Sequence, residues 1–169
     1  MDAKEMRLRD MKELIKKVEV WSKERGLNTA DPNKQRLKLW EEFGELNAAI
    51  ARDNRKDAID AIGDMIVVMI IYKQQLGYDS NDVFCPRKDN VDLLSRLDDT
   101  SLIDCIGRGI SDSQSCIEGL GMVTENLTVL AYRLNTNLKE CLAAAYDVIK
   151  DRRGKMVNGV FVKESDLNG

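Results

Sequence analysis

The sequence predicts an all-α protein, a helical bundle that ends in a small C-terminal β-hairpin. Aromatic residues make up only 5% of the 169 residues, whereas Leu, Ile, Ala, Lys and Glu are common, which is typical of helices. Two prolines, Pro32 and Pro86, interrupt the chain, and apolar residues recur at three- and four-residue spacing. We expect one domain over 1–169, with its core formed by about 4–77 and 100–152.

The first two helices are predicted from their apolar stripes and their end signals. A helix over about 4–25 is followed by Gly26 as a C-terminal stop, and its stripe is Met11, Leu14, Ile15, Val18 and Trp21. Asp31 before Pro32 predicts an N-cap with proline in the first turn of a helix that runs to about Asn54. The stripe of this second helix is Leu39, Phe43, Leu46 and Ile50, and we expect Trp40 in the core.

A third helix over about 56–76, ending at Gly77, is apolar on every side between Met65 and Ile71. One sheltered face does not explain such a segment, because a helix that is hydrophobic all round is buried on all sides. A partner subunit often supplies that cover, so we expect a homodimer or homotetramer.

The second half of the chain has weaker patterns. A connection over 78–99 should carry a short helix near 91–97, and 102–134 should form one short and one long helix. A last helix is expected over about 137–152. Asn158-Gly159 between two apolar stubs predicts a β-hairpin over about 154–164.

Composition excludes several kinds of function. The net charge of −3, with both signs spread along the chain, argues against nucleic acid or anionic lipid as a partner. The longest apolar run is too short to span a membrane and the start of the chain has no signal segment, so we expect a cytoplasmic protein. The absence of histidine excludes Ser-His-Asp catalysis and histidine-ligated metals. Chemistry must therefore use carboxylates, lysines and metal ions.

Two groups of acids lie on the predicted second and third helices. Glu41, Glu42 and Glu45 are close together on one, and Asp57, Asp60 and Asp64 share a sector of the other that continues into its apolar stretch. Each group alone would be an ordinary solvated face or a helix cap. Inward carboxylates on two facing helices cost several kcal/mol each unless they are neutralised, and Mg²⁺ or Mn²⁺ does so with oxygen ligands.

Basic residues cluster where the last helix meets the hairpin, at Lys150, Arg152, Arg153 and Lys155. They could simply complement the negative end of the helix dipole. They could also bind phosphate, since a polyphosphate ligand needs a metal on one side and Lys or Arg on the other.

Glu41-Glu42-x-x-Glu45, followed by a helix with Gly63-Asp64, resembles the EExxE…ExxD signature of the all-α nucleoside triphosphate pyrophosphohydrolases, the MazG-like group. The stretch 146–163 is similar to the ending of small members of this group that phages encode. The resemblance covers about 15–77 and 138–164. It implies a helical core built by two subunits, and hydrolysis of a (deoxy)nucleoside triphosphate between the α and β phosphates.

The resemblance also implies roles for individual residues. Glu42, Glu45 and Asp64 would be Mg²⁺ ligands, Glu41 or Glu45 the catalytic base, and Lys150, Arg153 and Lys155 the phosphate-binding residues. One position departs from the signature: Ala61 stands where the family has the first acid of ExxD, and Asp60, one turn before Asp64, is the expected substitute ligand. The alternative to an enzyme is a catalytically inactive, dimeric helical interaction protein.

Overall fold

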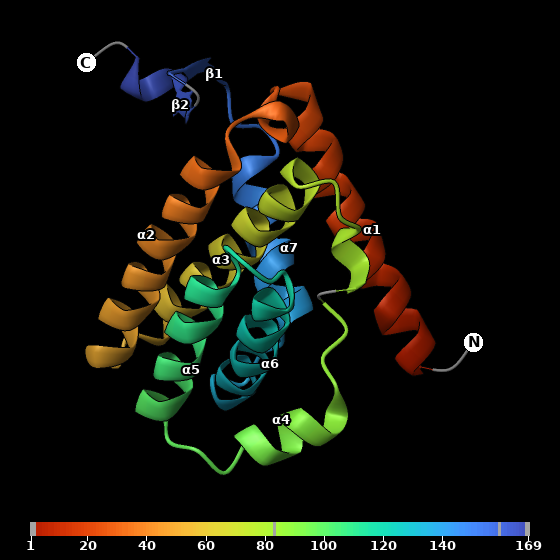
Figure 1. The fold of residues 1–169 in the computed structure, drawn as a ribbon, viewed down its shortest axis with the longest axis vertical. Helices are drawn as coiled ribbons and strands as arrows, with labels where there is room; N and C mark the ends of the chain where they lie inside the picture. The colour runs from red at the N-terminus through yellow and green to blue at the C-terminus, as the bar shows by residue number, and fades with distance from the viewer. Residues whose placement is uncertain (1–2, 83, 159, 168–169) are drawn as a thin grey trace.

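A computed structural model describes residues 3–82, 84–158 and 160–167, and within them the chain forms seven α-helices and one two-stranded sheet (Figure 1). The helices are α1 (Ala3–Glu24), α2 (Pro32–Ala51), α3 (Arg55–Gln75), α4 (Lys88–Leu94), α5 (Asp99–Asp112), α6 (Glu118–Arg133) and α7 (Leu138–Ile149). Strands β1 (Gly154–Val157) and β2 (Val160–Lys163) form the sheet. The all-α class and the C-terminal hairpin are confirmed.

The ends of the first three helices follow the signals in the sequence. Gly26 and Gly77 have φ values of +69° and +77°, the left-handed conformation that ends a helix most easily at glycine. The Asp31 carboxylate accepts a hydrogen bond of 2.9 Å from the Asn33 backbone N–H at the start of α2. Asn54 caps α3 in the same way.

Helix α3 is the centre of the molecule and packs against α1, α2, α6 and α7 of the same chain. Every side chain from Met65 to Ile71 is at most 7% exposed. The prediction that this segment is buried on all sides is therefore confirmed, and helices of the same chain supply the cover. The dimer or tetramer stays a prediction that the burial of α3 no longer supports.

The second half of the chain completes one continuous core. Helices α5 and α6 pack closely because Gly109 and Gly119 face each other, and a side chain at either glycine would collide with the other's carbonyl oxygen. Helix α4 lies across the far end of the bundle from the hairpin (Figure 1) and packs on α6. It begins and ends three residues earlier than the sequence predicts.

The hairpin contacts the last turns of α1. Val157 pairs with Val160, and Asn158 has the positive φ, +52°, that the predicted turn requires; Gly159 lies outside the described residues. Trp21 of α1 donates a buried hydrogen bond of 2.8 Å to the Ile149 carbonyl and packs edge-on against Phe161. Trp40 is 38% exposed, so its expected core position is wrong; it packs at the surface against Phe43.

Two helical glycines give a matched test of the packing of α3 against α7. An Ala side chain at Gly63 would overlap the Cys141 carbonyl oxygen and lie 2.9 Å from Ala145 Cβ, whereas at Gly44 it would meet nothing within 4 Å. We expect Gly63→Ala to lower the free energy of unfolding by about 1–3 kcal/mol through overpacking. Gly44→Ala should raise it by about 0.5–1 kcal/mol through helix propensity. Urea unfolding followed by circular dichroism measures both, and equal effects would contradict the close approach of α3 and α7.

Candidate acidic site between α2 and α3

Helix α2 carries three of the acids, and only one of them is buried. Leu39, Phe43 and Leu46 are buried in the core, and Glu42, which adjoins this face, is 6% exposed. Glu41 and Glu45 are exposed. Lys38, one turn earlier, lies 2.8 Å from Glu42 and 3.0 Å from Glu41. The buried carboxylate thus has one cation beside it.

Asp64 of α3 is half-buried, between the close approach at Gly63 and the apolar run that begins at Met65. Burial is the largest cause that raises its pKa, to about 6, and the negative charges of Glu42 and Glu45 add to it. Arg152 and Lys38 act in the opposite direction. The cations present therefore compensate this carboxylate only in part.

The same charges act on Glu45. Partial burial is the first cause that raises its pKa, followed by Glu42, while Lys38 and Lys163 lower it. Glu42, Glu45 and Asp64 thus lie within electrostatic reach of one another. We call these three residues together with Glu41 the acidic site.

The aspartates earlier on α3 lie differently from the prediction. Asp57 and Asp60 are exposed, so the expectation that they point into the bundle with Asp64 is wrong. The Asp57 carboxylate accepts a bond of 2.6 Å from the side chain of the helix cap, Asn54. The charge of Asp60 acts on the buried thiol of Cys141 in α7, whose pKa burial raises to about 11. Asp60 as a metal ligand stays a prediction.

Of the basic cluster, Arg152 is the residue whose charge acts on the acidic site. The side chain of Lys150 instead bonds to Asp147 at 2.8 Å and lines a cavity of about 380 Å³ with residues of α1. Arg153 and Lys155 are exposed, and neither is among the charges that act most on Asp64 or Glu45. Their phosphate-binding role stays a prediction.

Sequence reasoning placed Arg152 in the basic cluster but not among the phosphate-binding residues, and it did not select Lys163, although the charges of both residues act on the acids. A signal for Lys163 was present: counting outward from the Asn158-Gly159 turn pairs Lys163 with Gly154, next to the basic run. No local pattern distinguishes Arg152 from Arg153, because the way the chain turns between Ile149 and the hairpin decides which one faces the bundle.

The donors of the acidic site suit a hard divalent cation. They are all carboxylate oxygens, the ligands that Mg²⁺ prefers, and Asp64 is a half-buried carboxylate beside two others. Among the described residues, however, no three carboxylates or thiols are grouped closely enough to ligate one ion as they stand. Glutamate side chains on α2 must therefore rotate, and Lys38 must release Glu42, before one ion is shared.

The acidic site lies apart from the two cavities described below. A cavity of about 1140 Å³ lies over α6 and is lined by residues of α4, α5 and α6, and none of the four acids lines it or the smaller cavity at α1. Within the ranges that the structure describes, no helix is long and apolar enough to cross a membrane.

Comparison with known proteins gives one relative of interest. Over 73 residues the chain is 47% identical to an uncharacterized 18.2 kDa protein from the rep-hol intergenic region of Haemophilus phage HP1. The match covers 42% of this chain and 44% of the relative, so it spans less than half of either protein. No protein-family model matches the chain, and no solved structure matches it. The chain is therefore similar to a phage protein.

The raised pKa of Asp64 predicts a stability change with pH in metal-free buffer containing EDTA. Between pH 4 and 6 the folded state retains a proton that the unfolded state, with an ordinary pKa of 3.8, has released. The free energy of unfolding should therefore fall as pH rises through this window. Asp64→Asn should show a smaller fall and be more stable than the wild type at pH 7, on the order of 1 kcal/mol after solvent screening. Asp60→Asn, which removes an equal charge from an exposed position one turn away, is the control.

Proposed function

We propose that the protein is a metal-dependent nucleotide pyrophosphohydrolase, which cleaves a (deoxy)nucleoside triphosphate between the α and β phosphates to give the monophosphate and pyrophosphate. The observation that carries the proposal is the electrostatic state of Asp64. It is a half-buried carboxylate, beside Glu42 and Glu45, whose pKa burial and those neighbours raise to about 6. A half-buried carboxylate with such a raised pKa is typical of a group that binds a cation or acts in catalysis.

Glu42, Glu45 and Asp64 would hold Mg²⁺, with Mn²⁺ as a substitute. When bound, the ion would neutralise charge on the phosphates and make water a stronger nucleophile. The four residues of the acidic site are the EExxE glutamates and the final aspartate of the resemblance. Asp60 is exposed, so it would join them only from the edge of the site.

The chain's own side chains would share the remaining work. Glu41 and Glu45 are exposed and close to the buried Glu42, so either would accept the proton of the attacking water. Arg152 and Lys163 would hold the phosphates, because their charges already act on Asp64 and Glu45. Their positive charge would stabilise the charge on the transferred phosphoryl group.

An inactive interaction protein is the second candidate, and one observation favours it. Lys38 bonds to both Glu41 and Glu42, which is how a structural ion pair would satisfy these acids without a metal. Leu37 and Trp40, on the exposed side of the same helix, would then form part of the contact surface.

Activity is tested by pyrophosphate release from a panel of ribo- and deoxyribonucleoside triphosphates, with and without Mg²⁺. The wild type should release pyrophosphate only with the metal, and Asp64→Asn should lose turnover by at least about a thousandfold while keeping its helical circular dichroism. Asp60→Asn should retain most of the activity. If no triphosphate is cleaved, or if Asp64→Asn is as active as the wild type, the proposal fails.

The two neighbouring arginines give a matched test of the phosphate-binding residues. Losing a charge-assisted bond to phosphate costs about 1.5–3 kcal/mol, so Arg152→Ala should lower kcat/KM by roughly 10- to 100-fold. Arg153→Ala should change it by less than about threefold, because the charge of Arg153 is not among those that act most on the acids. Steady-state kinetics measures both, and the reverse order would restore the assignment made from the sequence.

A further inference from the structure

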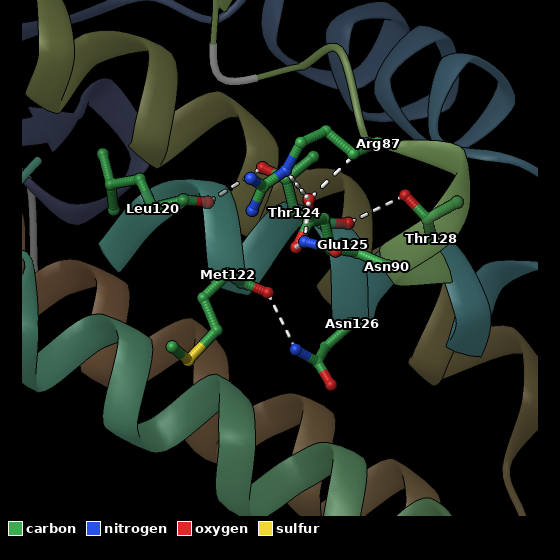
Figure 2. Close-up of polar contacts among 8 residues, drawn as sticks. All are labelled: Arg87, Asn90, Leu120, Met122, Thr124, Glu125, Asn126 and Thr128. Atoms are coloured by element: carbon green, nitrogen blue, oxygen red, sulfur yellow. Dashed lines mark hydrogen bonds and ion pairs between the residues drawn. The ribbon is translucent and has the colours of Figure 1, made fainter. Parts of the chain in front are cut away.

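The cavity of about 1140 Å³ follows the exposed side of α6 between α4 and α5, away from the acidic site. Gly121, Met122, Glu125 and Asn126 form part of its floor, and Figure 2 shows the polar contacts there. The volume is slightly above the roughly 300–1,000 Å³ typical of pockets that bind small molecules, so the cavity is large enough to hold one. Some hydrogen-bond acceptors in the cavity lack donors, and these acceptors indicate what kind of ligand the cavity can bind.

Glu125 is a buried carboxylate, 8% exposed, that fastens α4 to α6. Its Oε1 accepts bonds from Arg87 Nε at 3.2 Å and Asn90 Nδ2 at 3.0 Å, as Figure 2 shows. Its Oε2 accepts one bond, from Asn90 Nδ2 at 2.9 Å. Glu125 lines the cavity, and since each carboxylate oxygen has two acceptor sites, Oε2 can accept one more hydrogen bond.

Asn126, the next residue, is fully buried and has an unpartnered acceptor. Its Nδ2 donates a bond of 2.8 Å to the Met122 carbonyl, and its Oδ1 points away from that bond (Figure 2). Exchanging the two amide atoms would set oxygen against oxygen, so the free atom must be the acceptor. A buried acceptor without a donor costs about 1–3 kcal/mol, which a ligand N–H would recover.

The charges that line the cavity favour a cation. Four carboxylates, Asp79, Asp112, Glu118 and Glu125, face two cationic side chains, Lys73 and Arg87. Glu118 and Glu125 are seven residues apart on the same face of α6, which separates them by roughly 10 Å along the axis. Between them, Gly121 has open space where a side chain would be, and Met122 offers an apolar surface.

We propose that this cavity binds a linear polyamine, an aliphatic chain with ammonium groups near both ends. One ammonium group donates to Glu125 Oε2 and Asn126 Oδ1, and the other lies at Glu118. The methylene groups between them pass over Gly121 and contact Met122. The site is separate from the acidic site and does not depend on the proposed hydrolysis.

The test is a calorimetric titration of the full chain with spermidine, in EDTA and at physiological salt. We expect saturable binding of one molecule per chain, and weaker binding of putrescine, which carries one positive charge fewer than spermidine. Asn126→Leu and Glu118→Gln should each weaken spermidine binding by about fivefold or more. Asp151→Asn removes an equal charge outside the cavity and should change the affinity less than twofold.

Two further measurements do not depend on Asn126→Leu, which could disturb the packing of α6. In the wild type, spermidine should shift the backbone amide NMR signals of Gly121 and Met122 and leave that of Asp64 unchanged. The exposed Glu118 is not part of the core, so Glu118→Gln should fold normally. The proposal is overturned if spermidine does not bind, if Asp151→Asn weakens it as much as Glu118→Gln, or if Asp64→Asn abolishes binding.

Discussion

The rest of the structure depends on the burial of α3. Its segment from Met65 to Ile71 has no polar face, so the chain must surround it, and α1, α2, α6 and α7 do so. The approach of α3 to α7 is possible because residue 63 has no side chain. Asp64 adjoins this contact, and the requirement that buries the helix therefore also removes part of the water from its carboxylate.

The acidic site illustrates how a site can oppose the stability of the fold that forms it. Glu42 and Glu45 both disfavour ionisation of Asp64, and burial disfavours it further. A protein selected only for stability would have a neutral residue at this position. Replacing a functional residue commonly raises the stability of a protein at the expense of its activity. Under the proposed function, a bound metal ion accounts for the charge at this position.

Much of the fold follows from local signals in the sequence. The N-cap at Asp31, the stops at Gly26 and Gly77 and the stripes of α1 and α2 act within one or two helical turns, so they could be predicted. Which aspartates of α3 are buried could not, because a helix that is apolar all round has no pattern to show where its neighbours end. For the same reason, the cover supplied by α6 and α7 could be mistaken for that of a second subunit.

The contact between Trp21 and Ile149 joins residues 128 positions apart, and it has a consequence for the order of folding. Helices α2 and α3 are joined by a short turn, so the acids can come together early through local contacts. Arg152 and Lys163 lie beyond Ile149, and their approach requires closure of a loop that includes most of the chain. We therefore expect the anionic half of the site to form before the cationic half, and unfolding of α1 to loosen the contact between them.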